Sequence, residues 1–264
     1  MFLYFSIIFF IFSFIIIKLC SKYNVLIDDK SEKHKKFSTQ KKTHLLGGFL
    51  LIIFFCYYLL DNSLNYPFVT FLVLIFLVGI LSDIKKINSA SFRFLLQLIL
   101  VIFFVYFLNI EIKYSKIDLF DKFLKNQIFS VLFSTFCLLI LINGSNFIDG
   151  INGLVIKYYL LIYILIFWNL NYFSFELELL LYLIIALIVV LIFNLSGYIF
   201  LGDSGSYLIS LFTGIFLINF SADNAAITPY LIIVLLWYPC FELLFSMIRR
   251  FLKKTKTYEP DTQH

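Results

Sequence analysis

Long apolar runs alternate with short polar segments along the whole chain, and this pattern predicts membrane-spanning helices. Several of the runs are close to the ~17 residues that a helix needs to cross a bilayer. Lipid offers the backbone no hydrogen-bond partner, so runs of this length are expected to be helical. The nine predicted helices cover roughly residues 2–20, 45–60, 67–82, 92–109, 128–145, 154–170, 177–195, 207–222 and 229–248.

The composition supports this interpretation, because 62% of the residues are hydrophobic and only 14% are charged. A soluble domain of 264 residues cannot bury that much apolar surface. The first run has no basic residues before it and no cleavage site after it, so it predicts a retained helix rather than a signal peptide. We therefore expect an all-α polytopic membrane protein with about nine transmembrane helices and a single domain, residues 1–264.

The positions of lysine and arginine predict the orientation. If the first loop is cytoplasmic, 17 of the 21 basic residues lie on that side, and the other four lie between residues 113 and 125. Basic loops stay in the cytoplasm, so the N-terminus is predicted outside and the C-terminus inside. The net charge of +5 then reflects loop placement and does not indicate a nucleic-acid partner.

Short polar motifs interrupt the apolar pattern, all on the predicted cytoplasmic side. In the segment 202–206, the backbone around Gly202 and Ser204 opens the eighth helix, where amide groups favour a phosphate. Asp203 offers the hard oxygen atoms that suit Mg²⁺. The alternative is a glycine-rich turn whose polar residues only cap the helix.

A second motif covers residues 143–153. Asn143, Asn146 and Asp149 recur every third residue and would share one face of a helix, which Gly150 and Gly153 then end. This stripe of oxygen atoms is suited to a metal and a nucleotide. It is equally typical of a polar helix end in water.

Further charged groups lie at three other helix ends. Asp83 ends the third predicted helix and could position a lipid phosphate or accept its proton, while Arg93 could neutralise the phosphate. Arg249 and Arg250 could bind a diphosphate. The alternatives are an ordinary charged loop and the usual excess of basic residues in the cytoplasm.

The first loop is expected to contribute less to a site. Its histidines, His34 and His44, are too far apart in sequence to indicate a zinc pair and are expected to be solvated or phosphate-facing. Gly47 and Gly48 are expected to permit close helix packing.

Taken together and in this order, the motifs resemble those of the polyprenyl-phosphate N-acetylhexosamine-1-phosphate transferases. This family includes the undecaprenyl-phosphate N-acetylglucosamine-1-phosphate transferases and the phospho-N-acetylmuramoyl-pentapeptide transferases. The matching segments are His34 with Gly47 and Gly48, Ser82 with Asp83, residues 143–153, residues 202–206, and Arg249 and Arg250 with residues 260–264.

The resemblance implies an enzyme of the bacterial inner membrane whose active site faces the cytoplasm. Such an enzyme transfers N-acetylhexosamine-1-phosphate from a UDP-sugar to polyprenyl (undecaprenyl) phosphate and releases UMP. This is the first membrane step of cell-envelope glycan synthesis, as for lipopolysaccharide or the cell wall. Polyprenyl phosphate, the UDP-sugar and membrane lipid are then the expected partners, and a homodimer is an option.

The resemblance also implies roles for individual residues. Asp83, Asp149 and Asp203 are the expected catalytic residues, and Asp203, Asp149 and Asn146 the expected ligands of Mg²⁺, with Mn²⁺ as an alternative. The residues expected to bind substrate are Asn143, Asn146, Arg93, Gly202, Ser204, Arg249, Arg250 and His264.

The chain departs from the family pattern in three places. Ser82 replaces the first acid of an acidic pair, and Asn152 stands where many relatives have aspartate. The chain stops at His264, the first histidine of a longer motif, so we expect either a fragment or a protein without part of the diphosphate-binding loop. The alternatives are a non-catalytic relative and a transporter or lipid-binding protein. Transporters tend to place ionisable groups near the bilayer midplane, whereas here they lie at one surface.

Overall fold

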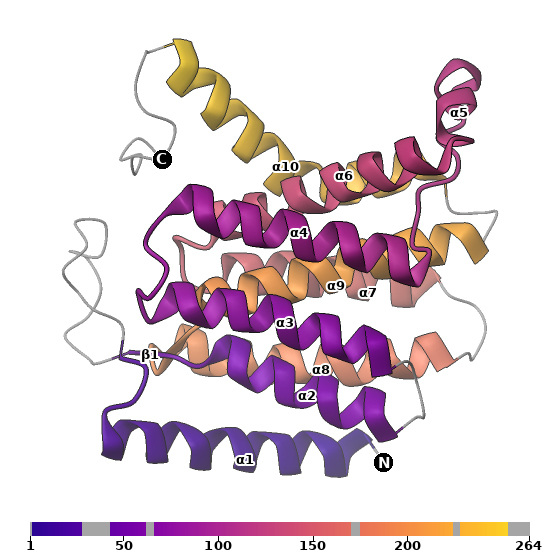
Figure 1. Ribbon diagram of the computed structural model, residues 1–264. Coiled ribbons are helices and arrows are strands. Elements are labelled where there is room, and N and C mark those ends of the chain that lie inside the picture. The colour runs from indigo at the N-terminus through magenta and orange to yellow at the C-terminus, as the bar shows by residue number, and fades with distance from the viewer. Residues whose placement is uncertain (1, 28–42, 62–65, 170–174, 224–227, 253–264) are drawn as a thin grey trace.

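The structure, a computed structural model, describes residues 2–27, 43–61, 66–169, 175–223 and 228–252. Within these residues, most of the helices run side by side from one end of the molecule to the other (Figure 1). The helices are α1 (Phe2–Tyr23), α2 (Gly47–Asp61), α3 (Tyr66–Asp83), α4 (Ala90–Leu108), α5 (Asp118–Leu124), α6 (Gln127–Ile148), α7 (Leu154–Asn169), α8 (Phe175–Leu195), α9 (Gly202–Asp223) and α10 (Pro229–Leu252). The strands are β1 (His44–Leu45) and β2 (Ile199–Phe200).

Each of the nine predicted apolar runs forms a helix, so these helix predictions are confirmed. In the described part of the chain, seven helices are long and apolar enough to cross a bilayer, namely α1, α3, α4, α6, α8, α9 and α10. Helices α2 and α7 are apolar but shorter, with 15 and 16 residues. The protein is therefore a multi-pass helical membrane protein, and the number of nine spans stays a prediction.

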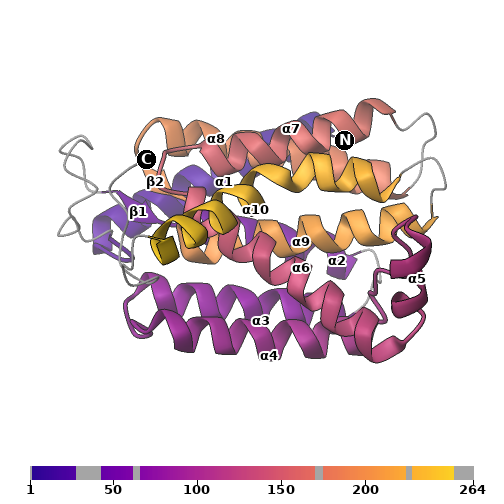
Figure 2. The same cartoon turned by 90° about the horizontal axis from the view of Figure 1, so that it is seen from above.

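Helix α9 is the central element of the bundle. It packs against α2, α3 and α6, and Figure 2 shows it between α3 and α7. In the most apolar stretch of α9, 83% of the residues are buried inside the protein, compared with 11% in the corresponding stretch of α10. Two of the buried hydroxyl groups of α9 bond to its own backbone: Ser210 donates to the Ser206 carbonyl and Thr213 to the Ile209 carbonyl, both at 2.6 Å. Polar side chains can therefore lie in the core without losing a hydrogen bond.

Glycines allow the helices that carry the polar motifs to come close together. A Cβ atom on Gly79 of α3 would lie 2.3 Å from Cα of Ser204 on α9. On α6, a Cβ atom on Gly144 would lie 2.3 Å from the backbone oxygen of Pro239 on α10. These distances are shorter than any real Cβ contact, so both crossings require glycine.

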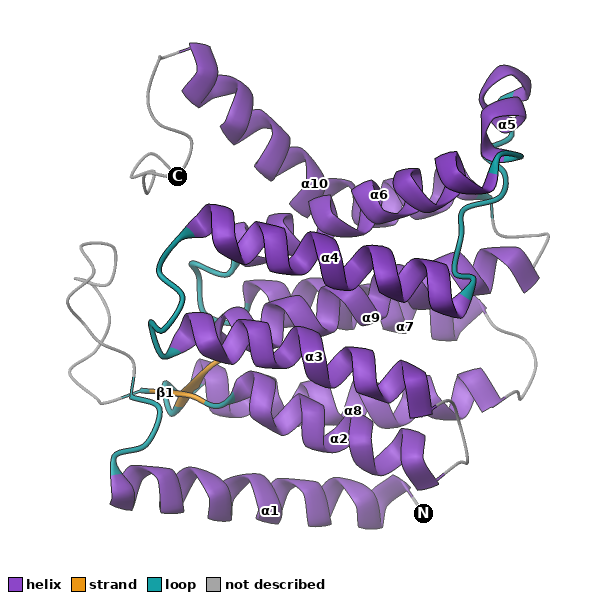
Figure 3. Ribbon diagram, viewed as in Figure 1, coloured by secondary structure: helices purple, strands orange, loops and turns teal. Residues whose placement is uncertain are grey.

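The two short strands were not expected from the sequence. They pair in parallel, with His44 opposite Ile199 and Leu45 opposite Phe200, and so join the segment before α2 to the segment before α9 (Figure 3). The His44 side chain is buried, and its Nδ1 lies 2.8 Å from the carbonyl oxygen of Val25. The expectation of a solvated or phosphate-facing His44 is therefore wrong. The buried ring instead bonds β1 to the segment that follows α1.

The expected close packing at the glycine pair is confirmed. A Cβ atom on Gly48 would lie 2.5 Å from both the backbone nitrogen of Gly205 and Oγ of Ser204. The Gly48 amide donates to the carbonyl of Leu201 at 3.1 Å. The first turn of α2 is thus pressed against the first turn of α9.

Helix α5, also not expected, lies at the end of the bundle opposite the two strands (Figures 1 and 2). Asp118 and Asp121 lie in its first turn, where a negative charge is favourable. The hydroxyl and amide of Ser115 both donate to Asp121 at 2.6 Å, and these hydrogen bonds hold the pKa of the Asp121 carboxyl below its usual value.

Candidate active site

The site begins at the turn between β2 and α9. Gly202 has a φ of +75°, in the left-handed region that glycine adopts without strain. A Cβ atom at this position would also lie 2.8 Å from a carboxylate oxygen of Asp83. Gly202 is thus required both for the turn and for the approach of Asp83.

Asp83 caps α9 from the end of α3. Its Oδ1 accepts a hydrogen bond from the Asp203 amide at 2.8 Å. Its Oδ2 accepts from the Ser204 amide at 3.1 Å and from the Ser204 hydroxyl at 2.7 Å. A carboxylate here satisfies free amides and is favoured by the helix dipole.

This cap concerns two sequence-based expectations: a phosphate at the amides of α9, and a substrate-binding role for Ser204. The amides of Asp203 and Ser204, expected to face a phosphate, both donate to Asp83. The Ser204 side chain is buried, and its hydroxyl has the same partner. In this geometry, the polar groups of Ser204 hold the turn together and are not open to a substrate.

Asp203 forms the charged centre of the site. Its Oδ2 accepts hydrogen bonds from Arg93 Nη1 at 2.7 Å and from the Ser82 hydroxyl at 2.5 Å, and Tyr207 Oη lies 3.5 Å away. Arg93 Nη1 is also 2.6 Å from Ser82 Oγ. Among the described residues, none hydrogen-bonds to the second oxygen, Oδ1, and about a quarter of each side chain of the ion pair is exposed.

The polar stripe of α6 approaches Asp203 from the side. Oδ1 of Asn146 lies 3.2 Å from the Ser206 hydroxyl, which in turn lies 3.1 Å from the backbone oxygen of Asp203. Asn143 donates to the side chain of Gln97, on α4, at 2.9 Å. As expected, Asn143 and Asn146 lie within one helix, which ends at Ile148 and has Asp149 as its C-cap.

The last turn of α10 lies against the end of α6. The guanidinium carbon of Arg250 is 5.6 Å from the ring centre of Phe147, which is a cation–π distance. Phe147 follows Asn146 directly, so Arg250 lies near the polar stripe. Arg249 and Arg250 are both half-buried. His34 and His264 lie outside the described residues.

The structure therefore brings five helix ends together at one end of the bundle. The ends of α3 and α6, the starts of α4 and α9, and the last turn of α10 supply Asp83, Asn146, Arg93, Asp203 and Arg250. Ser206, Tyr207 and Gln97 also join this network but were not selected from the sequence. Helical spacing could have found them, since Gln97 lies one turn after Arg93 and Ser206 and Tyr207 lie one turn after Asp203.

The donor atoms fit a magnesium ion bound together with a substrate. In the described residues, no three His, Cys, Asp or Glu side chains cluster as a metal site. Magnesium, however, is usually held by one or two carboxylates together with substrate phosphates and water. Asp203 and Asn146, which are connected through Ser206, offer such oxygen atoms, and Asp149 lies at the C-cap of α6, three residues after Asn146. A complete protein cage is therefore not required for the expected metal.

The fold and the site thus define a multi-pass membrane protein with one polar, charged site at the end of its helix bundle. The sequence pattern of glycosyl transferase family 4 matches residues 65–221, which is more than half of the chain. The chain belongs to this family, and it is a transferase of the type that moves a sugar phosphate to polyprenyl phosphate. The matched segment contains Asp83, Arg93, Asn146, Asp149 and Asp203. No curated protein matches the chain.

Proposed function

We propose that this protein transfers N-acetylhexosamine-1-phosphate from a UDP-sugar to polyprenyl phosphate and releases UMP, with Mg²⁺ as cofactor. The observation that carries the proposal is the convergence of Asp203, Arg93 and Asn146 at one end of the bundle. Carboxylate and amide oxygens beside guanidinium groups are suited to a metal-bound diphosphate.

The reaction needs positioning and charge neutralisation more than covalent chemistry by the protein. An oxygen of the acceptor phosphate attacks the β-phosphorus of the UDP-sugar. The bond from that phosphorus to the bridging oxygen breaks, and UMP leaves with the electron pair. The acceptor phosphate already carries a nucleophilic oxygen, so no side chain has to form a covalent intermediate.

Arg93 is the residue best placed to bind a phosphate oxygen. Its Nη1 lies within hydrogen-bond distance of Ser82 and Asp203, which fixes the guanidinium beside Asp203. Its remaining N–H groups are suited to phosphate oxygens. Arg250, beside Phe147, brings a second positive charge to the same region.

Magnesium, when bound, would neutralise charge on the diphosphate. Asp203 would hold it with Asn146 and Asp149. Ser206 would support this set, since its hydroxyl lies within hydrogen-bond distance of both Asn146 and the Asp203 backbone. The protein would thus supply a small number of oxygen ligands, which suits an ion that also binds substrate phosphates.

We assign Asp83 a positioning role. Its two oxygens accept three hydrogen bonds from Asp203 and Ser204, so it fixes the turn that carries Asp203. Proton transfer by Asp83 is not needed, because the acceptor phosphate is ionised at neutral pH. The site is assigned to the cytoplasmic side because basic residues are concentrated in the loops on that side.

A transfer assay tests the proposal. Purified protein in lipid nanodiscs is mixed with undecaprenyl phosphate, Mg²⁺ and a panel of UDP-N-acetylhexosamines labelled in the sugar. The label should move to the lipid fraction, with release of one UMP per sugar phosphate. Release of UDP instead of UMP would contradict the proposal, because it would mean that only the sugar is transferred.

A further inference from the structure

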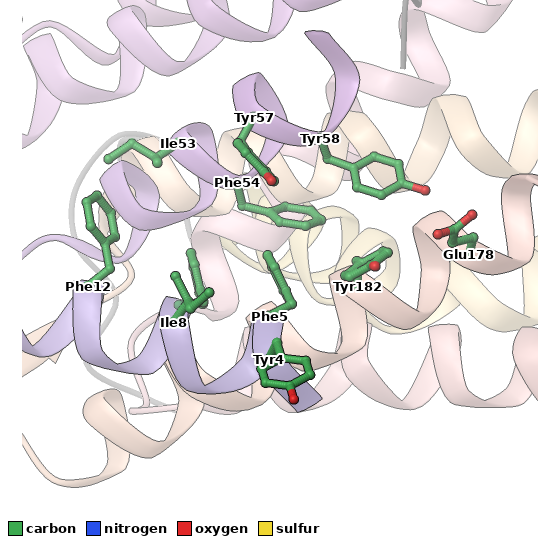
Figure 4. Close-up of a pocket in the computed structure, with 11 residues that line it drawn as sticks. Tyr4, Phe5, Ile8, Phe12, Ile53, Phe54, Tyr57, Tyr58, Glu178 and Tyr182 are labelled. Carbon is green, nitrogen blue, oxygen red and sulfur yellow. The ribbon is translucent and has the colours of Figure 1, made fainter. Parts of the chain in front are cut away.

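A cavity of about 420 Å³ lies between α1, α2 and α8, away from the candidate active site. Its volume is within the usual range of small-molecule sites. Its walls are mostly aromatic, and Figure 4 shows Tyr58 and Glu178 at one end and Phe12 and Ile53 at the other. The cavity is therefore polar at one end and apolar at the other.

The polar end lies at the side of the bundle opposite Asp203. Glu178 is in the first turn of the span Leu177–Leu195, and this end of α8 lies at the same side of the bundle as α5 (Figure 1). A half-buried carboxylate at the end of a membrane span favours a positively charged partner. Among the described residues, no basic side chain forms an ion pair with Glu178.

The aromatic residues beside Glu178 suit a cation as well. The rings of Tyr58 and Tyr182 lie 5.3 Å apart, and Phe5 packs against Tyr182 at 4.8 Å. Aromatic faces attract ammonium groups, and several faces together can form a cage for one. The tyrosine rings and one carboxylate provide this chemistry within a single cavity.

The position of the cavity identifies the source of the cation. Tyr4, Ile8 and Tyr57 line the cavity and are exposed on the outer surface of α1 and α2, which faces the bilayer. From Tyr4 to Phe12, α1 rises by about 12 Å, close to half of the ~30 Å hydrocarbon core. An occupant that enters from the bilayer and extends from the interface toward its centre is a lipid.

We propose that this cavity binds a membrane lipid with an ammonium headgroup. The ammonium lies at Glu178 among the tyrosine rings, and one acyl chain extends past Ile8 toward Phe12. The site is separate from the site of sugar-phosphate transfer and does not depend on that activity. A polyprenyl chain fits less well, because it has no positive charge to match Glu178.

Native mass spectrometry of the full chain in detergent tests the proposal. Phosphatidylethanolamine and phosphatidylglycerol with identical acyl chains are titrated separately. The wild type should bind phosphatidylethanolamine at about a tenfold lower concentration than phosphatidylglycerol. Glu178→Gln should lose this preference. Glu111→Gln should keep it, because Glu111 is a half-buried carboxylate near α6 that does not line the cavity.

A second variant tests the apolar end. Ile8→Trp adds volume at an exposed position and should weaken binding of phosphatidylethanolamine by about tenfold, with the protein still eluting as a folded species. The proposal would be overturned by equal binding of both lipids to the wild type or by an unchanged preference in Glu178→Gln. Displacement of the lipid by ethanolamine without acyl chains at the same concentration would overturn it too. Stronger binding of polyprenyl phosphate that depends on Glu178 would also overturn it.

Discussion

Arg93 and Asp203, which are 110 residues apart in the sequence, form an ion pair with Nη1 and Oδ2 separated by 2.7 Å. Ser82 hydrogen-bonds to both members. In the family pattern that the chain resembles, an aspartate stands at the position of Ser82. Here a hydroxyl takes that place, and Asp203 is the only carboxylate of the described residues that forms an ion pair with Arg93.

The first prediction concerns Asp203. Asp203→Asn should lower the transfer rate by a factor on the order of 10²–10⁴, because a charged group at a metal–phosphate site stabilises the transition state by several kcal/mol. The Mg²⁺ concentration needed for half-maximal activity should rise. The measurement is the initial rate at several Mg²⁺ concentrations.

Asp118→Asn is the matched control, since Asp118 is an exposed aspartate in α5 at the other end of the bundle. It should leave the rate unchanged. Full turnover of Asp203→Asn at limiting Mg²⁺ would show that the metal is held by other residues.

The second prediction separates two roles for Asp83. As a cap, Asp83 can be replaced in part by asparagine, which keeps one oxygen acceptor for the amides of α9. Asp83→Asn should therefore retain measurable activity, whereas Asp83→Ala should lose both activity and stability. The loss of a cap costs about 0.5–2 kcal/mol, and the melting temperature and rate are the measurements. Equal loss of activity in both variants at an unchanged melting temperature would indicate proton transfer by Asp83.

The third prediction tests the close contact of α2 and α9. Gly48→Ala places a Cβ atom 2.5 Å from the Gly205 nitrogen, so the first turn of α9 must shift. Overpacking of this kind typically costs about 1–3 kcal/mol, and the shift also moves Ser204 relative to Asp83. We expect a lower melting temperature and a lower transfer rate.

Gly150→Ala provides the control, because a Cβ atom placed there has no non-neighbouring atom of the described residues within 4 Å. Its melting temperature should match that of the wild type. Wild-type stability of Gly48→Ala would contradict the tight packing of the two helices.

The helices could be predicted from the sequence far better than their contacts. Apolar runs of about membrane length have one stable form in lipid, so all nine appeared as helices. The apolar run of α9 was predicted from residue 207, with the segment 202–206 opening the helix, and α9 does begin at Gly202. Its first turn is polar and rich in glycine, which has a low helix propensity, and the cap from Asp83 on α3 stabilises it.

The site could be predicted only as a set of residue types at helix ends. The sequence identified Asp83, Arg93, Asn146 and Asp203, but gave no sign that Asp83 caps α9 or that Arg93 pairs with Asp203. Both contacts join distant segments and follow no local spacing. The pairing of β1 with β2 was missed for the same reason, because two-residue strands have no detectable period.

The fourth prediction is the topology. Ser82 and Ser204 are buried and unsuited to labelling, so exposed positions are chosen. On a background in which the four native cysteines are replaced by alanine, Lys86→Cys and Asn152→Cys should react only from the cytoplasm. Lys122→Cys in α5 should react from outside. Labelling of Lys86→Cys and Asn152→Cys from opposite sides would contradict a common site.

The most direct test of the central claim is exchange of labelled UMP into UDP-sugar. Direct transfer between the UDP-sugar and the lipid phosphate exchanges one phosphoanhydride for another, so the reaction should run in both directions. Exchange should require the polyprenyl-diphospho-sugar, or polyprenyl phosphate with UDP-sugar, together with a divalent metal. Metal-dependent exchange without any polyprenyl lipid would contradict direct transfer and indicate a covalent enzyme intermediate.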